Sequence, residues 1–241
     1  MKMNPFNLVA ISMLTACSSG QWIVTTWGEE YIEQGIPSDE FVDGCSAKYD
    51  TFEVEFASAM LLDASEEVVG EMPSGRFELT SPGPQELGSV PVRAGDYERV
   101  YYEINTGSED AVHAAGTVTC GGETVSFDWT FPYDTRYRCL PLDITVDGDA
   151  DVVTELTIHG DHLFYDSLDD NGPELRGQAI VDADADGDGV VTSAELEAVT
   201  IAGLGYPVDI YVDITDLSAF ISHLVQGIGH VDGEGHCYVD R

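Results

Sequence analysis

Residues 184–195, which read DADGDGVVTSAE, constrain this chain more than any other stretch. Asp184, Asp186 and Asp188 place carboxylates at the first, third and fifth positions of this segment, and Glu195 places one at the twelfth. If the chain turns between them, these side chains direct their oxygens at one point. Ca²⁺ is a hard cation that takes about six to eight oxygen ligands at flexible geometry. The spacing therefore predicts a calcium-binding loop.

The residues between the carboxylates meet the other requirements of such a loop. Gly189, at the sixth position, has no Cβ and permits a sharp turn. Val190 offers its backbone carbonyl, Thr192 offers its hydroxyl or a bound water, and the apolar Val191 between them ties the loop to a neighbouring segment. The arrangement resembles an EF-hand loop at every ligand position. The resemblance implies the following calcium ligands: Asp184, Asp186, Asp188, Val190, Thr192 and Glu195.

Helical signals lie on both sides of the loop. Pro173 suits the first turn of a helix, so we expect an entering helix over Glu174–Asp182. We expect the exiting helix over Ser193–Ala202. Apolar residues three and four apart predict a further amphipathic helix within Asp213–Gly227, which Asp213 or Thr215 can cap.

EF-hand loops normally pair through the apolar residue at the eighth position of each loop. Counting back from Asp216 as a twelfth position gives a partner loop over 205–216, with Val212 at its eighth position. Of the first, third and fifth residues of this second loop, only Asp209 is acidic. We therefore expect a degenerate partner that packs against the first loop without binding calcium.

The beginning of the chain indicates export. An apolar stretch over Leu8–Ala16 is too short to span a bilayer and suits a signal peptide. The segment LTAC that ends at Cys17 resembles the lipobox of bacterial lipoproteins. The resemblance implies cleavage after residues 1–16, acylation of Cys17 and a membrane as the partner of this end. Ser18 in place of Asp implies the outer membrane of a Gram-negative cell envelope.

The charge of the chain excludes one class of partner. The formal net charge is −36 over 241 residues. Nucleic acids are excluded, because binding their phosphates requires a basic surface. An acidic surface attracts divalent cations, and it also resembles the surfaces of proteins from salty habitats. The sequence leaves open whether another partner is a protein or a glycan.

Four cysteines remain when Cys17 is set aside, and an even number in an exported chain favours two disulfides with three connectivities. They are Cys45, Cys120, Cys139 and Cys237. We favour a bond between Cys139 and Cys237, which would tie the C-terminal tail to the preceding domain.

Alternating apolar and polar residues predict strands between the first of these cysteines and Pro173. The clearest segments are Thr51–Phe56, Asp96–Ile104, Thr124–Phe131 and Val152–His159. Turn-forming residues separate them, which is typical of an antiparallel β-sandwich. We predict an α+β chain with these parts: a signal peptide over 1–16, a tether over 17–43, a β-sandwich over 44–172, an EF-hand-like helical module over 173–229 and a tail over 230–241 packed on the β-domain.

Histidines occur in two compact groups. His159 and His162 form one, and His230 and His236 form the other, next to Cys237. If Cys237 is bonded to the β-domain, the two groups can meet, and imidazoles with a carboxylate suit Zn²⁺ or Cu²⁺. We expect His159 to point outward from the polar face of its strand. The alternative is that each histidine only hydrogen-bonds to a nearby carboxylate.

Two functions follow from these features. The first is a calcium-binding, lipid-anchored exported protein with a structural or interaction role. The second is a transition-metal-binding protein that uses the histidines. The chain is similar to secreted bacterial lipoproteins that join a four-cysteine β-domain to an EF-hand, and its β-domain resembles copper-associated periplasmic proteins. No GxSxG, GxGxxG, HExxH or P-loop segment occurs, so we predict that the protein is not an enzyme.

Overall fold

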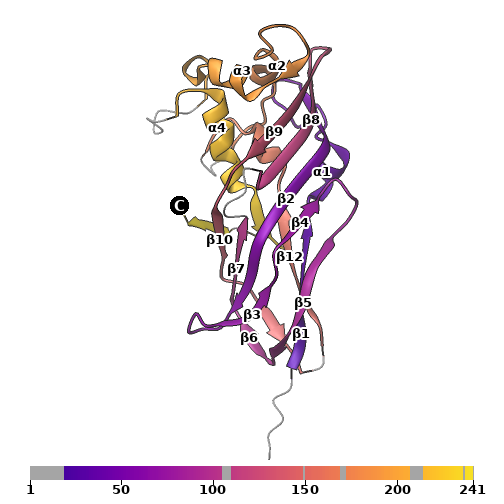
Figure 1. Ribbon diagram of the computed structural model, residues 1–241, viewed down its shortest axis with the longest axis vertical. Helices are drawn as coiled ribbons and strands as arrows, with labels where there is room; N and C mark the ends of the chain where they lie inside the picture. Colours follow the sequence, from indigo (N-terminus) through magenta and orange to yellow (C-terminus); the bar gives the residue numbers. More distant parts are fainter. Residues whose placement is uncertain are drawn as a thin grey trace, which may run out of the picture.

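The computed structural model of this chain has two β-sheets that pack face to face, with short helices gathered at one end (Figure 1). It describes residues 19–104, 110–148, 150–168, 172–206, 214–235 and 237–240. The predicted α+β class with a β-sandwich is confirmed. Both sheets contain a parallel pair of strands, so the sandwich is mixed and not wholly antiparallel.

The larger sheet is built around β2, which runs the length of the sandwich. Its strands follow the order β13-β9-β8-β2-β7-β10-β15. β8 and β7 pair with successive parts of β2, and β3 and β4 pair with the edge of β2 opposite to them. Its strands are β2 (Ser46–Leu62), β3 (Val68–Met72), β4 (Gly75–Glu78), β7 (Arg99–Ile104), β8 (Val112–Cys120), β9 (Glu123–Phe131), β10 (Thr135–Cys139), β13 (Val190–Val191) and β15 (Cys237–Asp240). Phe52, Val54 and Phe56 of β2 are buried, as their alternation with glutamates predicts.

The smaller sheet has the order β14-β12-β1-β5. Its strands are β1 (Ser19–Trp27), β5 (Gln85–Arg93), β12 (Val152–Ile158) and β14 (Gly229–Val231), while β6 (Gly95–Tyr97) and β11 (Ile144–Val146) form a separate pair. β1 is parallel to β12, and the buried Trp22 donates its indole N–H to Thr154 Oγ1 at 3.0 Å.

The structure corrects the predicted tether over 17–43. From Ser19 onward this stretch forms β1, an inner strand, and then α1 (Glu29–Gln34). Trp22, Val24 and Ile32 are completely buried in the core. The segment therefore belongs to the folded body, because its aromatic and β-branched residues fill the smaller sheet.

The helices are shorter than the sequence predicts. They are η1 (Asp161–Phe164), α2 (Gln178–Val181), α3 (Ser193–Ala198), η2 (Ile201–Gly203), α4 (Leu217–Leu224) and η3 (Val225–Gly227), where η denotes a 3-10 helix. The entering helix begins only at Gln178, because Leu175 forms β-bridges with Phe41 and Tyr165. Asp216 caps α4 by accepting the N–H of Ala219 at 2.9 Å, in place of the predicted caps.

One apolar core joins the sheets and the helices. Buried residues of α2, α3 and α4 belong to the same cluster as those of β2, β8 and β9. Two disulfides reinforce this core: Cys45–Cys120 joins β8 to the residue before β2, and Cys139–Cys237 joins β10 to β15. The predicted bond between Cys139 and Cys237 is thus present, and it holds the C-terminal tail on the larger sheet.

Candidate metal sites

The predicted calcium loop lies between α2 and α3, at the end of the molecule where the helices gather (Figure 1). Carboxylate oxygens of Asp184, Asp186 and Glu195 lie within 4.8 Å of one another. The Asp188 carboxylate instead accepts the N–H of Val190 at 2.8 Å. The fold thus brings three of the predicted side-chain ligands to one point, on a loop that is largely exposed to solvent.

Hydrogen bonds within the loop hold Asp184 at its centre. Its two carboxylate oxygens accept the N–H groups of Gly187 and Gly189 at 2.9 Å and that of Asp188 at 3.2 Å. Gly187 and Gly189 have φ values of 74° and 82°, which side chains with a Cβ rarely adopt. The glycine positions therefore let the loop wrap around the first carboxylate, as the sequence predicts for the sixth position.

Glu195 links the loop to α3. Its Oε2 accepts the backbone N–H of Thr192 at 2.9 Å, and the Thr192 hydroxyl in turn accepts the N–H of Glu195 at 3.3 Å. This reciprocal capping box fixes the first turn of α3. The hydrogen bonds from Thr192 lower the pKa of Glu195, which keeps it in the anionic form that binds a cation.

The apolar position of the loop docks on the sandwich. Val190 and Val191 form β13, which pairs in parallel with Ser126 and Phe127 of β9. The Val191 side chain is buried, and its carbonyl accepts the indole N–H of Trp129 at 3.0 Å. The neighbour of the loop in the described structure is thus a strand of the β-domain. Val212, the expected contact in a partner loop, lies outside the described residues.

A second candidate site is formed by three histidines, His159, His162 and His230, which we call the histidine cluster. Their ring centroids are 4.2 Å apart for His159 and His230, 5.4 Å for His159 and His162, and 5.2 Å for His162 and His230. The pairing of β12 with β14 creates this proximity, since Thr157 lies opposite His230. His236 of the predicted set lies outside the described residues.

His159 does not point outward as expected. Only 6% of its surface is exposed, and His230 is buried as well. His159 follows β12 directly, and its ring packs against the rings of His162 and His230. The last residues of β12 are buried on both faces, including Thr157. The prediction from local alternation was therefore wrong for His159, because side chains from segments distant in sequence, His230 and Glu29, pack around it.

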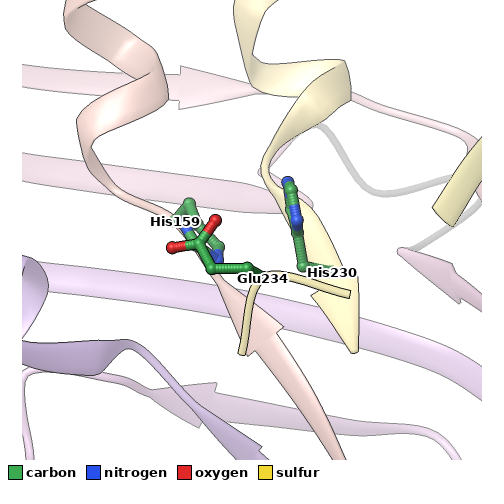
Figure 2. A group of neighbouring side chains, drawn as sticks. All are labelled: His159, His230 and Glu234. Carbon is green, nitrogen blue, oxygen red and sulfur yellow. The ribbon is translucent and has the colours of Figure 1, made fainter. Parts of the chain in front are cut away.

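Three carboxylates surround the histidine cluster. Glu29 Oε2 lies 3.7 Å from His159 Nε2, and Asp161 Oδ1 lies 3.9 Å from His159 Nδ1. Figure 2 shows the Glu234 carboxylate over the His159 ring, with His230 beside it on β14. Glu234 and Asp161 occur within the histidine-rich segments and could have been found there. Glu29 could not, because nothing in the sequence relates it to His159.

The electrostatics of the cluster follow from burial. Burial raises the pKa of Asp161. Burial also raises the pKa of Glu29, and the nearby carboxylates of Glu234 and Asp161 raise it further. Burial and the nearby His159 lower the pKa of His162 to about 3. A neutral imidazole at this position has a nitrogen lone pair free to accept a hydrogen bond or a metal ion.

The donor atoms form two overlapping sets. Ligand atoms of His159, His230 and Glu234 lie within 4.8 Å of one another, and so do those of His159, Asp161 and His162. A cavity of about 450 Å³ opens beside the cluster, and its lining includes His162, His230 and Glu234. Solvent and small solutes can therefore reach one side of the cluster.

Comparisons of the chain with protein-family models, curated proteins and solved structures find no match. Among the helices that the structure describes, none combines the length and apolar character needed to cross a membrane.

Proposed function

We propose that this chain is a calcium-binding, lipid-anchored exported protein with a structural role and no catalytic activity, in which Ca²⁺ bound by residues 184–195 fastens the helices to the β-sandwich. The EF-hand spacing of this loop carries the proposal. Convergence of the Asp184, Asp186 and Glu195 oxygens supports it. So does the docking of Val191 in the core, since it connects the loop to the sandwich.

The role of the ion follows from linkage between binding and folding. A cation that binds only the folded loop stabilises the fold by RT ln(1 + [L]/Kd), about 2.7 kcal/mol when calcium is at 100 times Kd. Extracellular calcium modules often bind with Kd of about 10⁻⁴ to 10⁻³ M, which suits permanent occupancy outside cells. With β13 paired to β9, such stabilisation extends beyond the loop to the sheet.

The proposed lipid anchor gives the molecule an orientation. Cys17 lies outside the described residues, and one residue, Ser18, separates it from the start of β1. β1 begins at the end of the long axis opposite α2 and α3 (Figure 1). Since only one residue of the sequence lies between Cys17 and β1, acylation of Cys17 would hold the sandwich close to the membrane and present the calcium loop on the far side.

The test is thermal unfolding of the mature protein with calcium and with a chelator, in high salt to suppress binding to the acidic surface. We compare Glu195→Gln with Glu197→Gln, which makes the same charge change at an exposed position of α3. The proposal expects calcium to raise the melting temperature of the wild type and of Glu197→Gln, with most of this rise lost in Glu195→Gln. An equal calcium response in both variants contradicts it.

A further inference from the structure

We propose that the histidine cluster is a second metal site, which holds one divalent transition-metal ion of the class that imidazole prefers, such as Zn²⁺ or Cu²⁺. His159, His230 and Glu234 supply the donor atoms, and His162 lies at its edge. This proposal is separate from the calcium loop, because none of its residues lies within 184–195. Either proposal can fail without the other.

The spacing of the donors fits a small ion after modest adjustment. Zinc binds imidazole nitrogen at about 2.0–2.1 Å, so tetrahedral ligand atoms are about 3.4 Å apart. The donor atoms of His159, His230 and Glu234 already lie within 4.8 Å of one another. Side-chain rotations that move these atoms by on the order of 1 Å would bring them to the spacing of tetrahedral ligands. The chemistry of two imidazoles with one carboxylate also matches the ligands of these metals.

His159 has a buried ring nitrogen, Nε2, without a hydrogen-bond partner in the part of the chain that the structure describes. The side chain is 94% buried, with 6% of its surface exposed, and Nε2 makes no hydrogen bond to any described residue. Buried polar atoms are normally paired, because burying one without a partner costs about 1–3 kcal/mol. Coordination of a metal would satisfy this nitrogen.

The surrounding charge favours a cation. Glu29, Asp161 and Glu234 approach the histidine cluster from three segments (α1, η1 and the turn after β14). Within the described residues, no Lys or Arg forms an ion pair with any of these carboxylates. Mutual repulsion between partly buried carboxylates is unfavourable, and a divalent ion among them would offset it.

The turn that carries Glu234 is held in place before any ion binds. Val231 and Gly235 exchange two backbone hydrogen bonds of 3.0 Å across it. The Asp232 carboxylate accepts the N–H of Glu155 at 3.0 Å, and Gly233 donates its N–H to Thr157 Oγ1 at 2.9 Å. The turn is therefore fixed to β12, the strand that leads into His159. Such support of the ligands is what a metal site requires.

Glu29 shows backbone strain at the same place. Its φ is 54°, an unfavourable value for a residue with a side chain. The Oε2 atom of Glu29 lies 3.7 Å from His159 Nε2. Strained residues of this kind persist where the surrounding structure holds them, often at binding sites. The cavity beside His162 and His230 then provides the path by which an ion reaches the donors.

The experiment uses the mature protein, stripped of metals by a chelator and then saturated with calcium so that the loop is occupied. Calorimetric titration with Zn²⁺ is expected to show one ion per chain. His159→Gln and Glu234→Gln are each expected to weaken this binding at least tenfold. The matched control is His113→Gln, a partly exposed histidine whose Nε2 lies 2.8 Å from Asp128 Oδ1; it should bind as the wild type does.

Electron paramagnetic resonance with one equivalent of Cu²⁺ gives an independent readout, and we expect coupling to at least two imidazole nitrogens in the wild type. Glu234 lies in an exposed turn, so Glu234→Gln tests the site even if His159→Gln fails to fold. The proposal is overturned if the wild type binds no stoichiometric ion or its copper spectrum shows fewer than two nitrogens. Unchanged affinity in Glu234→Gln, or equal weakening in His113→Gln, overturns it as well.

Discussion

Replacement of Val191 by alanine tests the contact through which the calcium loop is fastened to the sandwich. Val191 and Val190 are consecutive residues of β13, and both pair with β9 through their backbones. Their side chains differ sharply in environment, since Val191 is 1% exposed and Val190 is 40% exposed. Val191→Ala therefore removes two carbons from the core, and Val190→Ala removes the same two carbons from the surface.

The expected magnitude follows from burial. Removing two buried carbons costs about 1.6 kcal/mol at about 0.8 kcal/mol per methylene, and an incompletely filled cavity brings the loss to roughly 2–3 kcal/mol. Val190→Ala should change the free energy of unfolding by no more than about 0.5 kcal/mol, as exposed substitutions usually do.

The assay is urea unfolding of both variants and the wild type in saturating calcium, monitored by circular dichroism. Val191→Ala should also weaken calcium binding, because part of the ordering of the loop comes from its docking on β9. If both alanine variants are equally stable, Val191 does not fasten the loop, and the proposed link between the ion and the sheet is wrong.

Three further changes test other parts of the structure. Replacing Cys139 and Cys237 by serine opens a loop with a sequence separation of 98 and should lower the free energy of unfolding by up to about 4.7 kcal/mol in urea; a loss below about 1 kcal/mol would contradict the role given to this bond. Asp43→Ala removes the carboxylate that accepts two backbone N–H groups at the start of α2, so we expect a loss of about 1–2 kcal/mol by the same assay, and no loss would show that α2 needs no cap. Gly233→Ala places a Cβ at a φ of 78°, which should cost about 1–2 kcal/mol and weaken Zn²⁺ binding in calorimetry; unchanged stability would mean that the turn is not held as described.

The features that sequence predicts correctly here are encoded within short segments. Burial of Phe52, Val54 and Phe56 follows from a period of two along one strand. The sharp turn at Gly189, whose φ is 82°, follows from a glycine at a position where the chain must bend. Each of these depends on neighbours a few residues away, which is the range that a single sequence reports.

The features that sequence missed depend on partners far along the chain. β1 pairs with β12, placing Trp22 opposite Val152, and this contact turns a predicted tether into an inner strand. A long-range contact also buries His159, since the ring of His230 on β14 packs against it. The approach of Glu29 to His159 likewise exists only after the smaller sheet has formed. No local pattern reports such pairings, because their partners lie on separate segments.

The most direct test of the calcium proposal is the metal content of the purified mature protein, with its disulfides formed, after dialysis against calcium in high salt. Elemental analysis should find one calcium per chain in the wild type and in Glu197→Gln, and far less in Glu195→Gln. Chelator treatment should remove that ion. The account is contradicted if the wild type retains no calcium, or if Glu195→Gln retains as much as Glu197→Gln.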